Sequence, residues 1–196
     1  EGDAAIVTWV PREPTRGRWR APSAGVTWNE QPLDASTYTW GEDAIVWGGY
    51  VVKVEDDSPK DLSSIVGCAV LTGAGAVTHT AKVRPQESVA IFGVGGVGMS
   101  AIQMASILEA YPIIAVDLDE EKLKFAKEFG ATHTVNAKNV DPVEAIIEIT
   151  GGGADYAFDA IGLQVTNEQI LPATRSGGSG ADNIGGMAVL IGMPGP

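Results

Sequence analysis

The second half of this sequence predicts an α/β fold, a doubly wound parallel sheet with helices on both faces. Three observations support this prediction. From about residue 66, apolar runs alternate with stretches of helical character. The runs are apolar throughout, as is typical of parallel strands that are covered on both faces. A glycine-rich turn follows the first run. The residues before about position 65 are irregular and predict a smaller, mainly β piece.

Five apolar runs are predicted strands, and the segments that follow the first four are predicted helices. The strands are expected at 89–94, 112–118, 133–137, 155–162 and 187–193, and the helices at 100–110, 120–130, 142–152 and 165–173. Parallel strands need such helical crossovers between them. The Gly- and Ser-rich run 176–186 predicts a mobile loop.

The first 65 residues contain two predicted strands, 4–10 and 44–54, which are rich in β-branched and aromatic residues. The stretch between them holds four prolines and no sustained helical period, so it is interpreted as a loop or an insertion. Trp28, Trp40 and Trp47 are interpreted as core anchors rather than a binding platform. The chain begins in what is interpreted as the middle of a segment and stops directly after a predicted strand, so we expect a fragment of a longer protein.

Composition and charge exclude several classes of protein. The net charge of −12 would repel a nucleic acid, and the short basic run at 12–20 is interpreted as a solvated loop. Cys68 is the only cysteine, which excludes an internal disulfide and fits a reducing compartment. No apolar run approaches the ~20 residues that span a bilayer. We therefore expect a cytoplasmic protein without nucleic-acid or membrane partners.

The glycine-rich turn is the most specific motif. Gly93, Gly95 and Gly98 form G-x-G-x-x-G directly after a predicted strand and at the start of a predicted helix. The first glycine permits a tight turn, the second lets the backbone approach a pyrophosphate, and the third lets the helix pack closely on the strand. N–H groups at the helix start favour the phosphate charge. These features predict a Rossmann-type dinucleotide site; the alternative is a purely structural turn.

An acid at the end of the next strand indicates which dinucleotide is bound. Asp117 follows Gly98 by 19 residues, where a carboxylate can accept hydrogen bonds from the adenosine ribose. The acidic residues at 119–121 would add to the repulsion of a 2′-phosphate, so NAD is favoured over NADP. Lys122 is the nearby cation, and it either reaches the ribose or pairs with a neighbouring acid.

The last two predicted strands should contribute to the same crevice, because ligands bind at the carboxyl ends of the strands in such sheets. Ile161 is a candidate contact for the adenine. Ile191 and Met193 are candidate contacts for the nicotinamide ribose. For each of these side chains, a role in the core is the alternative.

Three runs carry a resemblance to a known family. They are GCAVLTGAGAV (67–77), VAIFGVGGVGMSAIQMA (89–105) and IIAVDLDEEKLKFAKEFGATHTVN (113–136). Together they resemble the zinc-dependent medium-chain alcohol dehydrogenases over residues 60–196, and more weakly toward the N-terminus. The resemblance implies that 1–65 is part of a GroES-like catalytic domain. It implies that 66–196 is the Rossmann domain, cut before its last strand.

The resemblance also implies roles for individual residues. Cys68 matches the third protein ligand of the catalytic zinc, Thr72 and Val97 match contacts of the nicotinamide, and Asp117 and Lys122 match contacts of the ribose. Gly96 belongs to the glycine loop. The implied chemistry is reversible hydride transfer between a zinc-bound alkoxide and NAD, with zinc as the Lewis acid. The substrates implied are small alcohols or aldehydes, and the full-length protein is implied to form homo-oligomers.

The sequence departs from the family pattern at the metals. A catalytic zinc needs three protein ligands, and the family's first Cys and its His would lie upstream of residue 1. His79 and His133 are interpreted as structural or surface residues, so zinc is expected only in the full-length parent. The segment 11–44, where many relatives carry a four-cysteine structural zinc lobe, has no cysteine. We therefore expect no structural zinc.

Two alternatives to an NAD-dependent alcohol dehydrogenase stay open. One is a zinc-free NADPH-dependent quinone or enoyl reductase of the same superfamily, in which Cys68 would be a small buried apolar residue. The other is a non-catalytic dinucleotide-binding module. The sequence does not identify the alcohol or aldehyde.

Overall fold

The computed structural model describes residues 2–8, 27–32, 46, 48–178 and 184–193. The chain divides into two compact units, residues 1–68 and residues 69–196. None of the helices in these described ranges has the length and hydropathy needed to cross a membrane.

The first unit contains short strands and short helical segments. Its elements are β1 (Ala5–Val7), β2 (Thr27–Trp28), β3 (Gln31–Pro32), the 3-10 helix η1 (Gly48–Tyr50), β4 (Val51–Lys53), α1 (Lys60–Ser63) and the start of the π-helix η2 (Val66–Val70). The predicted strands 4–10 and 44–54 thus contain β1 and β4, which pair antiparallel with Ile6 opposite Val52. Within the predicted loop, β2 and β3, each of two residues, pair as a short antiparallel hairpin. The predictions for the basic run 12–20 and for the tryptophan side chains lie outside the described residues.

The second unit contains the predicted five-stranded sheet, and all of its strands run parallel. The strands are β5 (Val89–Phe92), β6 (Ile113–Asp117), β7 (His133–Asn136), β8 (Tyr156–Asp159) and β9 (Met187–Leu190). Their spatial order is β7-β6-β5-β8-β9. The chain therefore moves outward from β5 to one edge and then returns to the other side of β5. The loops after β5 and β8 flank this switch point, where doubly wound sheets bind ligands.

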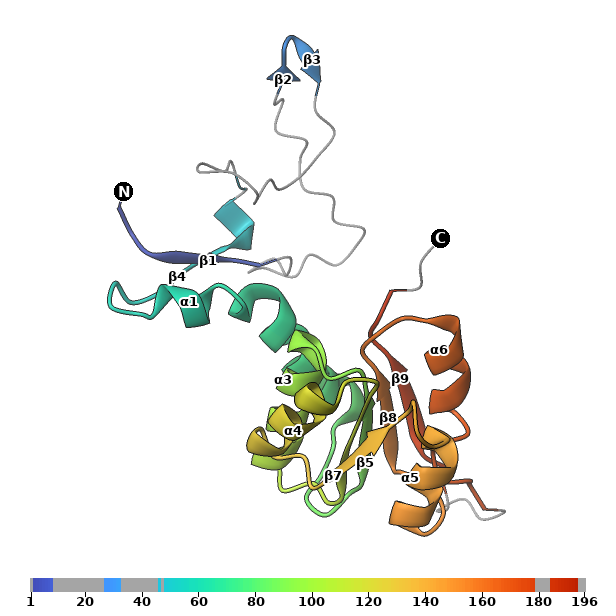
Figure 1. Ribbon diagram of the computed structural model, residues 1–196. Coiled ribbons are helices and arrows are strands. Elements are labelled where there is room, and N and C mark those ends of the chain that lie inside the picture. The colour runs from blue at the N-terminus through green and yellow to red at the C-terminus, as the bar shows by residue number, and fades with distance from the viewer. Residues whose placement is uncertain (1, 9–26, 33–45, 47, 179–183, 194–196) are drawn as a thin grey trace. The chain divides into compact units, whose positions relative to one another are not determined.

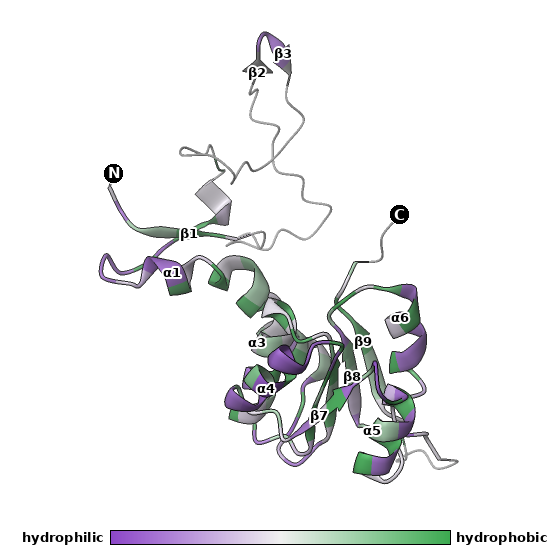
Figure 2. Cartoon of the chain, viewed as in Figure 1, coloured by the Kyte–Doolittle hydropathy of each residue, from purple (hydrophilic) through white to green (hydrophobic). Residues whose placement is uncertain are grey.

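Helices cover both faces of this sheet, as Figure 1 shows, with α3 and α4 on one face and α5 and α6 on the other. They are α2 (Leu71–Gly75), the π-helix η3 (Ala76–Ala81), α3 (Gly96–Ile107), α4 (Glu120–Glu128), α5 (Pro142–Thr150) and α6 (Gln164–Ile170). Side chains of β5 alternate between two cores: Val89 and Ile91 pack in one, and Ala90 and Phe92 in the other. All four are buried. This double burial explains the continuous apolar runs, which are coloured as hydrophobic in Figure 2.

The helix boundaries follow local capping signals. Asp119 caps α4 by accepting hydrogen bonds from the N–H groups of Glu121 and Lys122. Asp141 caps α5 in the same way, with Pro142 in its first turn. α3 begins at Gly96, four residues before the predicted start. Apolar periodicity missed this first turn because glycines have low helix propensity, and close packing of the turn on β5 stabilises it instead.

Candidate functional site

The glycine loop after β5 has the backbone geometry that its sequence predicts. Gly93 has a φ of +87°, a conformation that side chains rarely adopt. A Cβ added at Gly98 would lie 1.9 Å from the Gly93 carbonyl oxygen, so α3 approaches the end of β5 as closely as backbones allow. A Cβ added at Gly95 would meet no atom of the described residues within 4 Å, and Gly95 is exposed. The loop therefore leaves room for a ligand beside its backbone.

The start of α3 offers N–H groups to that space. Gly95 is the N-cap and has no side chain to accept hydrogen bonds from the first turn. The first α-helical hydrogen bond of α3 runs from the Met99 N–H to the Gly95 carbonyl. The N–H groups of residues 96–98 therefore have no acceptor within the helix, and with the helix dipole they favour an anion.

Asp117, the last residue of β6, is attached to the glycine loop. Its Oδ2 accepts a hydrogen bond of 2.9 Å from the Val94 N–H. Its Oδ1 accepts from the N–H groups of Leu118 and Asp119, at 2.7 and 3.0 Å. Asp117 is half-buried. A carboxylate has about four lone-pair sites, and three backbone N–H groups use three of them here, so about one remains to accept from a ribose hydroxyl.

The start of α4 adds further negative charge beside Asp117. The N–H groups of Lys122 and Glu121 donate to the Asp119 carboxylate and hold its pKa below the usual value. Glu120 and Glu121 are exposed in the first turn. Among the described residues, the ion pair on this helix is formed by Lys124 with Glu121, and Lys122 forms none. Lys122 is exposed, which leaves its ammonium group accessible to a ligand.

The loop after β8 lies against the glycine loop. A Cβ added at Gly93 would come within 2.3 Å of Ile161 Cγ1, so the Ile161 side chain covers Gly93 while staying 41% exposed. At the end of β9, Ile191 is half-buried and packs against the core on the α3 side. Met193 is 87% exposed. Of these three predicted contacts, Ile161 is the one whose packing places it directly on the glycine loop.

The resemblance implies two nicotinamide contacts, Thr72 in α2 and Val97 in α3, and these two helices pack against each other. A Cβ added at Gly73 would lie 2.2 Å from the Val97 carbonyl oxygen, so these two helices approach closely at a glycine. Thr72, one residue earlier, is exposed, and Val97 is half-buried. Gly96, also exposed, faces Ala69, with 3.3 Å between an added Cβ and the alanine Cβ. Thr72 therefore lies in the chain next to the glycine at which α2 contacts Val97.

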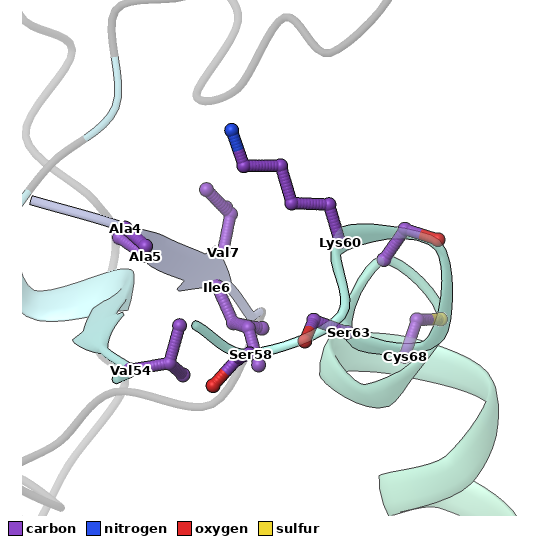
Figure 3. A pocket seen from close by; sticks show the side chains of 10 residues that line it. Ala4, Ala5, Ile6, Val7, Val54, Ser58, Lys60, Ser63 and Cys68 are labelled. Carbon is purple, nitrogen blue, oxygen red and sulfur yellow. The ribbon is translucent and has the colours of Figure 1, made fainter. Parts of the chain in front are cut away.

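Cys68 belongs to the first unit and lines a pocket there of about 470 Å³. The apolar wall of the pocket comes from β1 and Val54, and its polar groups come from Ser58, Lys60, Ser63 and Ser64. In Figure 3 the Lys60 side chain extends away from the turn that carries Cys68. The thiol is free and exposed, in contrast to the buried residue expected of a zinc-free reductase.

Neither histidine lies in a metal cluster. The Nδ1 atom of His79 is 2.6 Å from the hydroxyl of Thr78, and that of His133 is 2.9 Å from the hydroxyl of Thr132. Within the described ranges, no three His, Cys, Asp or Glu side chains gather in a way that could hold a metal ion. The described residues therefore do not complete a zinc site.

Asp159, the last residue of β8, is a candidate that no motif in the sequence indicated. It is fully buried, and its carboxylate accepts hydrogen bonds from the N–H groups of Ile161 and Gly162. A charged residue inside the apolar run 155–162 was the available signal, because buried acids are rare without a specific partner.

This chain is similar to known proteins in sequence and in fold. Residues 96–195 match the zinc-binding dehydrogenase family. The chain is 39% identical over 160 residues to alcohol dehydrogenase class-P of Arabidopsis thaliana, covering 81% of this chain and 40% of that protein. Its structure is similar to benzyl alcohol dehydrogenase of Acinetobacter calcoaceticus, with a TM-score of 0.68, 38% identity, and coverage of 77% and 40% of the two chains.

A quinone oxidoreductase of Pseudomonas syringae also has a similar structure, with a TM-score of 0.64 and 26% identity over 74% of this chain and 42% of that one. The chain spans about 40% of the length of the curated relatives it matches. The matches therefore compare this chain with less than half of each relative.

Proposed function

Because the chain belongs to the zinc-binding dehydrogenase family, we propose that its second unit binds NAD(H) for hydride transfer between an alcohol and an aldehyde. The parent enzyme would be an NAD-dependent alcohol dehydrogenase, of which residues 1–65 form part of the catalytic domain. The relatives named above support this class of substrate, since they are an alcohol dehydrogenase and a benzyl alcohol dehydrogenase.

The observation that carries this proposal is the hydrogen bond from the Val94 N–H to Asp117. It joins the acid that would bind the ribose to the loop that would bind the pyrophosphate. Both groups lie at the carboxyl ends of neighbouring strands, β5 and β6, beside the switch point of the sheet. A dinucleotide needs both groups at the same edge of one sheet.

The described residues fit a dinucleotide. The open backbone at Gly95 admits the pyrophosphate, and the first N–H groups of α3 donate to it. The Asp117 carboxylate accepts from a ribose hydroxyl at its remaining lone-pair site, and Ile161 offers an apolar surface to the adenine. Thr72 and Val97 are proposed to orient the nicotinamide, and Ile191 and Met193 to contact its ribose. When bound, NAD accepts a hydride at C4 of the nicotinamide.

For zinc, the proposal extends to a single ligand. Cys68 is proposed as one ligand of the zinc in the full-length parent. The described residues do not complete that site, so no step of the reaction is derived through a metal.

A second candidate is a quinone reductase that uses NADPH, and the similarity to the Pseudomonas syringae enzyme favours it. The charge at the ribose end counts against it. A 2′-phosphate there would be close to the negative charges of Asp117 and of the ionised Asp119. Glu120 and Glu121, in the first turn of α4, add two more negative charges. Repulsion of this kind disfavours NADPH relative to NADH.

A fluorescence titration with NADH and NADPH tests the proposal. The wild-type chain should bind NADH saturably and more tightly than NADPH. Replacing Asp117 by Ser removes the negative carboxylate that would accept from the ribose, so NADH affinity should fall by about tenfold or more and the preference over NADPH should narrow. Glu128→Gln is a matched control, because it removes one negative charge from the exposed far end of α4.

The two candidates predict different results. A wild-type preference for NADPH would overturn the NAD proposal in favour of the reductase. An unchanged preference in Asp117→Ser would refute the ribose role of Asp117. An equal change in Glu128→Gln would mean that net charge, and not the position of the carboxylate, sets the preference.

A further inference from the structure

Asp159 is a buried carboxylate at the carboxyl end of β8. It pairs with Phe92 at the end of β5 and with Leu190 at the end of β9, so it lies beside the switch point of the sheet. Its relative exposure is 0%. Among the described residues no Lys or Arg forms an ion pair with it. Burial of an unpaired carboxylate is costly and needs a specific compensation.

Backbone N–H groups supply that compensation. Oδ1 accepts from Ile161 at 2.9 Å and from Gly162 at 3.2 Å, and Oδ2 accepts from Gly162 at 3.2 Å. The main-chain carbonyl of Asp159 accepts from Ile191 and Gly192, each at 2.9 Å. One residue therefore ties the turn after β8 and the turn after β9 to the same point.

These hydrogen bonds hold a tightly packed arrangement. Gly162 has a φ of +88°, and a Cβ added there would lie 2.4 Å from the carbonyl oxygen of Met193. The two turns thus meet backbone to backbone. Between Asp159 and Gly162, the Ile161 side chain projects onto Gly93. The position of Ile161 over the glycine loop depends on the path of this turn.

We propose that Asp159 is a positioning residue for the dinucleotide: its carboxylate holds the turn 160–162 so that Ile161 stays over the glycine loop as an apolar surface for the adenine. This inference rests on the proposed function of the second unit. Asp159 touches no ligand itself and acts through the backbone of Ile161 and Gly162.

The chain offers a matched control on the same strand. Asp155 lies directly before β8, at the opposite end of the strand, and its carboxylate also accepts from backbone and side-chain donors. It lies at the amino end of the sheet, away from the glycine loop. Asp155→Ala should therefore lower stability without changing NADH affinity. Asp159→Ala should lower both.

The experiment compares NADH titrations and thermal unfolding for the wild type, Asp155→Ala, Asp159→Ala and Asp159→Asn. An asparagine oxygen can still accept from Ile161 and Gly162. Asp159→Asn should therefore keep the NADH dissociation constant within about threefold of wild type, whereas Asp159→Ala should raise it about tenfold or more. Amide exchange at Ile161 and Gly162 should accelerate in Asp159→Ala and stay slow at Ile91 in the core of β5.

A double mutant tests the route through Ile161. If Asp159 acts by placing that side chain, Ile161→Ala should weaken NADH binding alone but add little in the Asp159→Ala background. Fully additive losses would overturn this route.

Equal NADH affinity in the wild type and in Asp159→Ala would overturn the positioning role while leaving the proposed function intact. Failure of the wild-type chain to bind NADH would instead refute the proposed function, and with it any cofactor role of Asp159.

Discussion

Two alanine substitutions in the glycine loop should separate ligand approach from helix packing. At Gly95 an added methyl group meets no atom within 4 Å in the part of the chain that the structure describes, and the residue has a φ of −78°, which alanine adopts easily. At Gly98 the same methyl group would lie 1.9 Å from the Gly93 carbonyl oxygen. One change adds volume to the ligand space, and the other adds volume to the core.

The expected magnitudes follow from these distances. Real Cβ contacts essentially never fall below 3.0 Å, so in Gly98→Ala the new Cβ and the Gly93 carbonyl oxygen must separate by at least the 1.1 Å between 3.0 and 1.9 Å. Overpacking of this kind costs about 1–3 kcal/mol of stability. Gly95→Ala should change the free energy of unfolding by less than about 1 kcal/mol. It should weaken NADH binding by at least about tenfold, or 1.4 kcal/mol.

Urea denaturation and NADH titration of both variants provide the test. Gly95→Ala should unfold at nearly the wild-type urea concentration but bind NADH poorly, whereas Gly98→Ala should lose both stability and binding. Wild-type NADH affinity in Gly95→Ala would refute the interpretation of Gly95 as the point of pyrophosphate approach. Wild-type stability in Gly98→Ala would refute the close packing of α3 on β5.

Two further predictions concern charged residues of the second unit. Burial raises the pKa of Asp155, but hydrogen bonds from Ser88 and Arg175 lower it by more, so its folded-state pKa lies below the usual value. The stabilisation from the ionised Asp155 should be fully present above the unfolded-state pKa of about 3.9 and be lost as the pH falls through the lower folded-state pKa. Urea unfolding at pH 7 and pH 3 should therefore show a smaller loss of stability on acidification in Asp155→Asn than in the wild type. An equal loss in the two proteins would contradict this prediction. Lys122→Ala should weaken NADH binding about two- to fivefold, whereas the control Lys124→Ala, which breaks the ion pair with Glu121, should leave it unchanged. Equal NADH affinities for the two variants would mean that Lys122 is a surface lysine with no role in binding the ribose.

Much of the second unit is predictable from local sequence patterns. All five predicted strands are confirmed within a few residues of their predicted ends, because strands buried on both faces leave uninterrupted apolar runs. The helix cap at Asp119 and the tight turn at Gly93 likewise depend on residues that are close together in the sequence. The first turn of α3 was missed, since residues 96–98 form a helix only where tertiary packing compensates for glycine.

The fold class of this protein, the order in which its strands follow one another along the chain, and the glycine loop and the acid at Asp117 can be predicted from the amino-acid sequence alone, because each depends on neighbouring residues along one element. Which of these groups contact one another becomes visible in the three-dimensional structure. The contact of Asp117 with Val94, the packing of Ile161 on Gly93 and the burial of Asp159 join loops that follow different strands. Such contacts depend on which strands are neighbours in the sheet and on their register. They therefore cannot be predicted from the spacing of residues along the chain.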